Sequence, residues 1–294
     1  MTRTILLFIF LAASAFSQPK LKVLISVDME GIAGVVTGDQ LSPEGFEYQR
    51  FRDFMTKEAV AAVQAAKEAG ATEILVVDAH GNGQNLLIEQ FPKDVRIIRS
   101  WPRRFSMVAG IDRSFDALIF IGYHSSTNNP KGVRAHTFSS ARLTRVAVND
   151  REMSEGSWNA AIAGHFGVPV VMISGDDAAV QEARALIGNI EAAEVKQSLG
   201  FHSAKTLTPE ASCELIAQKV IAGLRRVKDF KPYTVSNPVI LDVSFKHYTV
   251  SEVLAYLKGV ERTDSHSIRY VGKDMTEIAD FMVVVTNYSL SLEP

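Results

Sequence analysis

Short, continuous hydrophobic runs alternate along this chain with stretches in which apolar residues recur every three or four positions. The continuous runs predict strands at residues 22–27, 73–77, 117–121, 143–148, 169–173 and 192–195. The helically spaced stretches predict a helix that begins near Ser42 and ends at Gly70, and others at residues 154–164, 177–186 and 209–227. Strands without polar alternation are buried on both faces, as in a parallel sheet covered by helices. The pattern therefore predicts an α/β fold with a mostly parallel sheet flanked by helices.

The pattern changes near residue 230, where the last of these helices ends in a polar segment and Pro238 follows. Beyond it we expect a strand at 239–243, a helix near 251–257, a strand at 267–271 and a helix from Met275 onward. The sequence therefore predicts a main α/β domain at residues 18–230 and a smaller C-terminal α/β portion at residues 231–294.

The first 17 residues have the pattern of a secretory signal peptide. Arg3 precedes an apolar run at residues 5–13, and the small residues Ala15 and Ser17 stand where a signal peptidase requires them. This run is short for a membrane span, and no other run is longer. We therefore expect cleavage after Ser17, export to the periplasm or the medium, and no membrane span in the mature chain. An uncleaved N-terminal anchor is the alternative.

Composition excludes several other classes of protein. Hydrophobic residues make up 47% of the 294 residues and charged residues 22%, and the formal net charge is −2. These values argue against a disordered chain and against a nucleic-acid-binding surface. Cys213 is the only cysteine, so no intramolecular disulfide can form. Its neighbours predict a helix interior, where a free cysteine is more often a packed hydrophobic side chain than a catalytic thiol.

Carboxylates and imidazoles follow three of the predicted strands. Asp28 and Glu30 end the first strand, Asp78 and His80 the second, and His124 the third. Carboxyl ends of parallel strands converge on the ligand site of an open α/β sheet. Asp28 and Glu30 point to the same side of an extended segment, where a cation between them would relieve their repulsion. The mixture of oxygen and nitrogen ligands suits zinc or another first-row metal, and five or six ligands suffice for two ions.

Each of these residues also has an ordinary structural interpretation. Asp28 and Glu30 could form a solvated strand end, and His80 could belong to the turn that continues through Gly81-Asn82-Gly83. That glycine-rich turn lacks the spacing of a phosphate-binding loop. Asp78 is predicted to support the site by orienting a neighbouring imidazole, not to bind a metal itself.

Blocks of sequence in a fixed order resemble the D-aminopeptidase family, zinc-dependent peptidases of the dipeptide-transport operon type (peptidase family M55). The first block, Ser26-Val27-Asp28-Met29-Glu30-Gly31, is similar to the family signature S-x-D-x-E-G. Further similar blocks lie at residues 78–80, 105–107, 122–124, 132–136, 149–151, 154–160, 175–177 and 195–197. The resemblance extends over essentially all of the mature chain. The chain departs from the family pattern in two ways. It carries an export signal, and it has Ser154 where glycine is usual.

The resemblance implies two zinc ions per subunit. Asp28 would bridge both ions. Glu30 and His80 would complete one zinc site, and His124 and Glu155 would complete the other. Without the resemblance, Glu155 would be read as an ordinary glutamate at a helix start, where the helix dipole favours it.

Two further residues gain a role from the same resemblance. His136 would be the catalytic residue, lying beside the ions without binding them and moving a proton or stabilising an oxyanion. Asn85 would lie near the site as a supporting residue. Arg134, close to His136, could hold a substrate carboxylate, and a surface salt bridge is the alternative.

The resemblance implies an aminopeptidase that hydrolyses the N-terminal peptide bond of short peptides, with D-amino acids such as D-alanine in the substrate. It also implies a ring-like homo-oligomer, a decamer, with the active sites facing an inner chamber. Two other functions stay open. One is a different two-metal hydrolase such as a phosphoesterase, and the other is an exported, non-catalytic protein that binds peptides.

Overall fold

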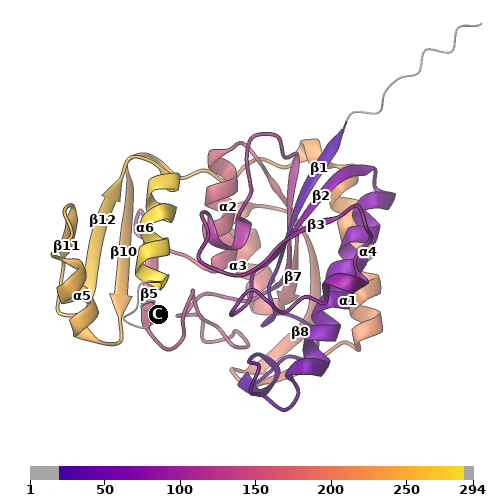
Figure 1. The fold of residues 1–294 in the computed structure, drawn as a ribbon, viewed down its shortest axis with the longest axis horizontal. Helices are drawn as coiled ribbons and strands as arrows, with labels where there is room; N and C mark the ends of the chain where they lie inside the picture. The colour runs from indigo at the N-terminus through magenta and orange to yellow at the C-terminus, as the bar shows by residue number, and fades with distance from the viewer. Residues whose placement is uncertain (1–19, 288–294) are drawn as a thin grey trace, which may run out of the picture.

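Two β-sheets organise the chain in the computed structural model, which describes residues 20–287 (Figure 1). The predicted signal peptide lies outside the described residues. The larger sheet has the strand order β3-β2-β1-β4-β7-β8-β9. Its strands are β1 (Leu21–Val27), β2 (Ala71–Asp78), β3 (Arg96–Ile98), β4 (Ala117–Tyr123), β7 (Val170–Asp176), β8 (Glu191–Gly200) and β9 (Ser203–Thr206). Every neighbouring pair is parallel except β8 and β9. The predicted α/β fold with a mostly parallel sheet is confirmed.

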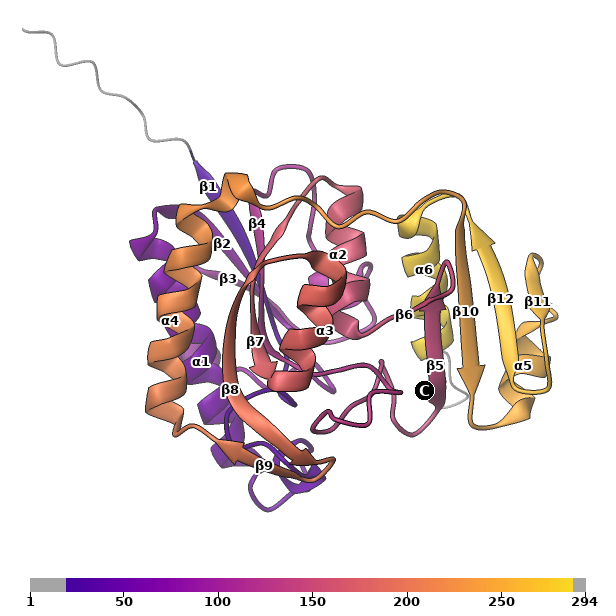
Figure 2. The ribbon, with the colours of Figure 1, turned by 180° about the vertical axis from the view of Figure 1, so that it is seen from behind.

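Helices cover both faces of this sheet, as Figures 1 and 2 show. Helices α1 (Tyr48–Glu68) and α4 (Pro209–Arg225) lie on one face, and α2 (Glu155–His165) and α3 (Asp177–Ile187) lie on the other. Alternate residues of β1 explain the arrangement. Val23 and Ile25 pack in the core that contains α1 and α4, whereas Leu24 packs in the core that contains α2 and α3. A strand placed between two cores must be apolar at every position, which is the pattern seen in the sequence.

The smaller sheet is antiparallel and has the order β11-β12-β10-β5-β6. Its strands are β5 (Leu143–Val148), β6 (Arg151–Glu152), β10 (Val239–Phe245), β11 (Val260–Arg262) and β12 (Ser267–Gly272). Two helices belong to it, α5 (Tyr248–Leu254) and α6 (Met275–Asn287). Helix α6 packs against β10 and β12 and also against α2 of the larger unit (Figure 1). Strands β5 and β6 come from the middle of the chain, so the smaller unit is not formed by the C-terminal residues alone.

Helix α1 begins at Tyr48 and not near Ser42 as the sequence pattern predicts. Residues 38–47 instead form a short 3-10 helix, η1 (Gly38–Gln40), and a series of turns. Gly45 lies so close to the backbone of Asp39 that a Cβ atom there would stand 2.2 Å from the Asp39 carbonyl oxygen. This close approach favours a turn over a helix. The remaining 3-10 helices are η2 (Ile88–Gln90), η3 (Ser106–Val108) and η4 (Val227–Asp229).

Two glycines fix the loop after β1 against the end of β4. The Gly31 N–H donates a hydrogen bond of 2.7 Å to the Gly122 carbonyl oxygen. A Cβ atom on Gly31 would lie 2.0 Å from the Tyr123 carbonyl oxygen, and one on Gly122 would lie 2.3 Å from that of Asp28. Gly122 also has a φ of +71°, which favours glycine. These contacts hold the carboxyl ends of the two strands together, where the candidate site lies.

None of the helices formed by residues 20–287 combines the length and the hydrophobicity needed to cross a membrane.

Candidate metal centre

Carboxylates and imidazoles from separate parts of the chain meet at the carboxyl edge of the larger sheet. They are Asp28 and Glu30 after β1, His80 after β2, His124 after β4, His136 in the loop that follows, and Glu155 at the start of α2. All are buried except His136, whose side chain is 14% exposed. The structure thus brings together all the predicted ligands and the predicted catalytic histidine.

Asp28 lies at the centre of the cluster. Its Oδ1 is 3.3 Å from the Nδ1 of His80, and its Oδ2 is 3.4 Å from the Nε2 of His124. The two carboxylate oxygens therefore face two different imidazoles. This is the arrangement that a carboxylate bridging two metal ions requires.

A second carboxylate accompanies each imidazole. Glu30 Oε2 lies 2.9 Å from His80 Nδ1, and Glu155 Oε2 lies 3.3 Å from His124 Nε2. Potential ligand atoms lie within 4.8 Å of one another in two groups, one of Asp28, Glu30 and His80 and the other of His124, His136 and Glu155. Asp28 belongs to the first group, but one of its oxygens also faces His124. The backbone N–H of Phe138 donates a hydrogen bond of 2.6 Å to Glu155 Oε1, which orients that carboxylate.

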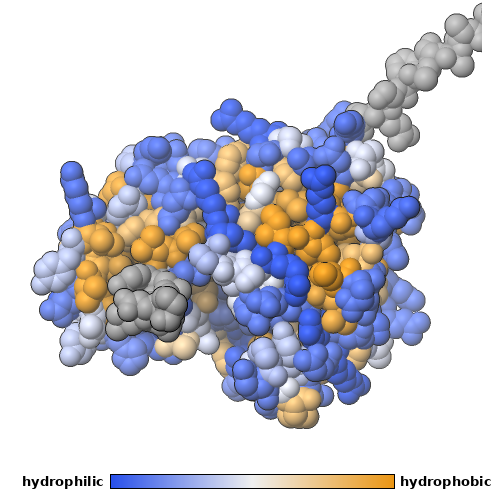
Figure 3. Space-filling model, viewed as in Figure 1, coloured by the Kyte–Doolittle hydropathy of each residue, from blue (hydrophilic) through white to orange (hydrophobic). Residues whose placement is uncertain are grey.

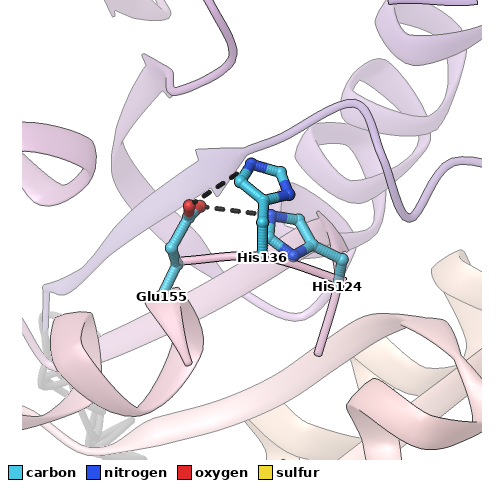
Figure 4. A group of neighbouring side chains, drawn as sticks. All are labelled: His124, His136 and Glu155. Carbon is cyan, nitrogen blue, oxygen red and sulfur yellow. Dashed lines mark ion pairs between the residues drawn. The ribbon is translucent and has the colours of Figure 1, made fainter. Parts of the chain in front are cut away.

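His136 lies farther from the carboxylates than the other two histidines. Its Nε2 is 3.8 Å from Glu155 Oε1 and 4.0 Å from Glu30 Oε1. Its ring stacks on that of His124, with the ring centres 4.1 Å apart and an angle of 11° between the planes, and both rings face Glu155 (Figure 4). His136 covers the cluster on the cavity side, whereas His124 lies beneath it. This position suits a residue that meets a substrate.

One ring nitrogen of each histidine is occupied by a backbone carbonyl oxygen. His80 Nε2 is 2.7 Å from the Leu41 oxygen, His124 Nδ1 is 3.0 Å from the Ser125 oxygen, and His136 Nδ1 is 2.8 Å from the Arg134 oxygen. A carbonyl oxygen can only accept, so each of these nitrogens is the N–H donor. In the neutral ring the opposite nitrogen then has a free lone pair directed into the cluster, as metal-binding histidines require.

Burial and the mutual attraction of carboxylates and imidazoles shift the pKa values of the cluster in different directions. Burial and repulsion from Glu30 raise the pKa of Asp28. Burial opposes ionisation of Glu30, but the facing imidazoles, His80 above all, hold its pKa well below the usual range. Burial also opposes a charge on His80 and on His124, yet the adjacent carboxylates raise both pKa values well above the ordinary value. Three buried carboxylates need positive charge nearby, which metal ions or protonated imidazoles can supply.

Two facing atoms in the cluster have no hydrogen-bond partner among the described residues. They are Asp28 Oδ2 and His124 Nε2, which are fully buried and 3.4 Å apart. Leaving a buried polar atom unpaired costs about 1–3 kcal/mol. Both are atoms that bind first-row metals through a lone pair, so a cation between them would satisfy both. The residues present therefore fit a metal site.

Asp78 and Asn85 lie beside the cluster and organise the loop that holds His80. Asp78 accepts hydrogen bonds from the backbone N–H groups of Asn85 and Leu86, at 2.6 and 2.8 Å, and from the Asn85 side chain at 2.8 Å. Asn85 also donates to the His80 carbonyl oxygen at 2.7 Å. The carboxylate of Asp78 is thus occupied by the loop, and no hydrogen bond among residues 20–287 joins it to an imidazole. The predicted orientation of an imidazole by Asp78 is therefore not seen, and Asp78 acts on His80 only through the loop that Asn85 connects to it.

Ser154, the position at which the chain departs from the expected family pattern, caps helix α2. Its Oγ accepts a hydrogen bond of 3.2 Å from the backbone N–H of Ser157, so Glu155 occupies the first helical position. Serine is among the most favourable residues at this position. The departure from the family pattern therefore preserves the placement of Glu155.

Lys196 is a part of the site that sequence reasoning did not assign. It is 2% exposed, and its Nζ donates hydrogen bonds to the carbonyl oxygens of Glu30, Ile32 and Val35. Burial lowers its pKa to about 8. These three bonds fix the segment that follows Glu30. The available signal was a lysine directly after the apolar run at 192–195, in one of the blocks of family resemblance.

Replacing Lys196 with methionine is expected to lower the free energy of unfolding by about 3 kcal/mol or more. A hydrogen bond from a charged donor contributes about 1.5–3 kcal/mol, and three buried carbonyls would lose theirs. Denaturant unfolding of the metal-free protein measures the effect. Lys205→Met, at an exposed lysine on the neighbouring strand β9, is the matched control. Equal stabilities of the two variants would contradict the role given to Lys196.

A cavity of about 230 Å³ opens above the cluster. Its floor includes Asp28, Glu30 and Glu155, and its walls include Trp101, Met107, Phe138, Arg142, Thr286 and Asn287. Thr286 and Asn287 belong to α6, so the smaller unit forms part of the wall. Arg134 does not line this cavity, and its guanidinium lies over the Phe201 ring at 5.2 Å.

Cys213 lies on α4, away from this cavity. Burial raises the pKa of its thiol to about 11, so the thiol is not a ready nucleophile.

Comparisons with known proteins identify similar chains. The family of peptidases M55, described as D-aminopeptidase, matches residues 21–284. A D-aminopeptidase of Bacillus subtilis (strain 168) is 34% identical over 271 residues, which are 92% of this chain and 98% of that protein. A solved structure, the Zn-dependent D-aminopeptidase DppA from Bacillus subtilis, a self-compartmentalizing protease, is similar with a TM-score of 0.87 and 33% identity. The match covers 93% of this chain and 99% of that one.

Proposed function

The chain belongs to the D-aminopeptidase family, and on this premise we propose that it is a zinc-dependent aminopeptidase that removes the N-terminal residue from short peptides containing D-amino acids. The observation that supports this most directly is the buried carboxylate–imidazole cluster with its two facing, unpaired ligand atoms. The zinc dependence of the similar DppA agrees with the nitrogen and oxygen ligands found here.

We propose two zinc ions per subunit, with Asp28 bridging them. Glu30 and His80 would complete the first site, and His124 and Glu155 the second. The two oxygens of Asp28 facing two different imidazoles support the bridging role. Zinc held by these residues would supply a Lewis acid for the scissile carbonyl and would make hydroxide available near neutral pH.

The residues of the chain position the substrate and move the proton. His136 is the partly exposed member of the cluster, and its Nδ1 N–H donates to the Arg134 carbonyl oxygen. Its Nε2 is therefore free to accept a proton and to deliver it to the leaving amine nitrogen, or to donate to the developing oxyanion when protonated. Trp101, Met107 and Phe138 add apolar surface to the wall of the cavity, against which a substrate side chain can pack.

Four substrates test the type of reaction and its stereochemical preference. We expect D-alanyl-p-nitroanilide to be hydrolysed with a kcat/KM at least about tenfold above that of the L-isomer, a difference of about 1.4 kcal/mol in transition-state binding. Nitrophenyl phosphate and a nitrophenyl ester serve as the other two. Preferred cleavage of the phosphate would favour a phosphoesterase. Binding of D-alanyl peptides by the zinc-loaded protein without turnover would favour a non-catalytic peptide-binding protein.

We also propose that the protein is exported and forms a ring-like homo-oligomer, a decamer. The similar DppA is a self-compartmentalizing protease. Apolar side chains exposed around α5 support an interface, because Tyr248, Val253 and Tyr256 are 58%, 54% and 87% exposed. Hydrophobic surface over the smaller unit is visible in Figure 3. Light scattering of the purified protein gives the subunit number, and N-terminal sequencing of protein recovered outside the cytoplasm tests cleavage after Ser17.

A further inference from the structure

Negatively and positively charged side chains are unevenly distributed among the residues that line the cavity above the candidate metal centre. Asp28, Glu30 and Glu155 place three carboxylates on its floor. Among the lining residues that the structure describes, Arg142 is the only one with a guanidinium or ammonium group. A ligand that lies in this cavity therefore meets the metal-binding carboxylates at one part of the wall and a single fixed positive charge at another.

Arg142 is held in place by hydrogen bonds to uncharged groups. It immediately precedes β5, and its Nη2 donates a hydrogen bond of 2.6 Å to the Thr286 carbonyl oxygen, near the end of α6. Its Nε lies 3.5 Å from Ser139 Oγ. No carboxylate within residues 20–287 forms an ion pair with it. A guanidinium has five N–H donors in a planar fork, so donors are left for a ligand.

The size of the cavity limits what that ligand can be. Its volume of about 230 Å³ is below the roughly 300–1,000 Å³ of pockets that take drug-sized molecules. Only a small molecule can extend from the metal centre to the Arg142 side of such a cavity. A peptide whose N-terminal bond lies at the metals would reach this wall with the residue or residues that follow.

We propose that Arg142 binds the C-terminal carboxylate of a short peptide, so that the enzyme acts on free D-dipeptides in preference to longer or C-terminally blocked chains. This inference rests on the proposed aminopeptidase function. A carboxylate matches the planar fork of a guanidinium in charge and geometry, which neither an amide nor an aromatic leaving group does. Arg134, the arginine that the sequence suggested for this role, lies outside the cavity lining and packs on Phe201.

The test compares three substrates with the same N-terminal residue: D-Ala-D-Ala, its C-terminal amide, and D-alanyl-p-nitroanilide. For the zinc-loaded wild type we expect a lower KM for the free dipeptide than for its amide. Arg142→Gln should raise the KM for the free dipeptide by about 10- to 100-fold, the loss expected for one charge-assisted contact. It should leave the KM for the amide and for the anilide within about twofold. Arg142→Lys, which retains the charge, should recover part of the loss.

Arg113→Gln is the matched control, because Arg113 is an exposed arginine outside the cavity lining. It should leave all three KM values unchanged. Equal losses on the free dipeptide and the amide in Arg142→Gln would overturn the proposal, since they would show that the contact to Thr286 is structural. A wild type that does not distinguish the dipeptide from its amide would also overturn it. Failure of the zinc-loaded wild type to cleave any of the three substrates would instead refute the aminopeptidase function, and this inference with it.

Discussion

Replacing Asp28 with asparagine is expected to remove both zinc ions from each subunit. Asp28 presents Oδ1 to His80 and Oδ2 to His124, so each half of the centre depends on the same carboxylate. An amide has one acceptor oxygen and no charge, and it cannot bridge two cations in the same way. We expect the affinity for zinc to fall by more than the roughly 10- to 100-fold that loss of a supporting residue costs. Metal analysis by atomic absorption after dialysis measures the stoichiometry.

Two variants provide the matched comparison for Asp28→Asn. Glu30→Gln and Glu155→Gln each remove a carboxylate from one half of the centre only, since Glu30 faces His80 and Glu155 faces His124. Each should therefore retain about one ion per subunit. If Asp28→Asn keeps the wild-type zinc content, or loses only one ion, the bridging role is wrong.

Replacing His136 with alanine is expected to retain both zinc ions and to lower kcat by about 100- to 10,000-fold, the range typical for loss of a general acid or base. The Nε2 of His136 is 3.8 and 4.0 Å from the nearest carboxylate oxygens, whereas His80 and His124 come within 2.9 and 3.3 Å. His136 also lines the cavity. Steady-state kinetics with D-alanyl-p-nitroanilide and metal analysis of the same sample measure both properties.

His247→Ala is a suitable control for His136→Ala, because His247 is an exposed histidine in the smaller unit. It should change neither the zinc content nor kcat. His136 could also be grouped with His124 and Glu155 as a ligand, since their ligand atoms lie within 4.8 Å of one another. Loss of one zinc ion in His136→Ala would show that His136 is a ligand and not the catalytic residue.

The strands of the larger sheet could be predicted from the sequence because each is buried on both faces. Leu24 faces one core while Val23 and Ile25 face the other, so β1 appears in the sequence as a continuous hydrophobic run. Such a run can be identified as a strand without knowing which strands it pairs with. The pairing of strands is a different problem. Strand β5 was expected from its own pattern, yet it pairs with β10, nearly a hundred residues later. Nothing local in an apolar strand specifies which sheet it joins.

The candidate site was predictable where it depends on strand ends. Asp28, Glu30, His80 and His124 directly follow β1, β2 and β4, and these strands are neighbours in the sheet. His136 and Glu155 lie in a loop and at a helix start, where spacing alone does not reveal the partners. Only the resemblance to the D-aminopeptidase family pointed to these two residues.

Two residues with an inferred role could not be found from local sequence because their partners are distant. Lys196 binds carbonyl oxygens about 160 residues away, and Arg142 binds the carbonyl oxygen of Thr286 across the two units. A buried lysine and an exposed arginine are ordinary in a sequence. Their roles follow only from the cavity and the loop that the fold places beside them.

We propose that Asp28 joins two zinc ions at the carboxyl edge of the larger sheet. Anomalous scattering from a zinc-loaded crystal, recorded on both sides of the zinc absorption edge, tests it most directly. We expect two peaks per subunit, about 3.5–4 Å apart, with one oxygen of Asp28 at each. A single peak, or two peaks of which only one contacts Asp28, would contradict it.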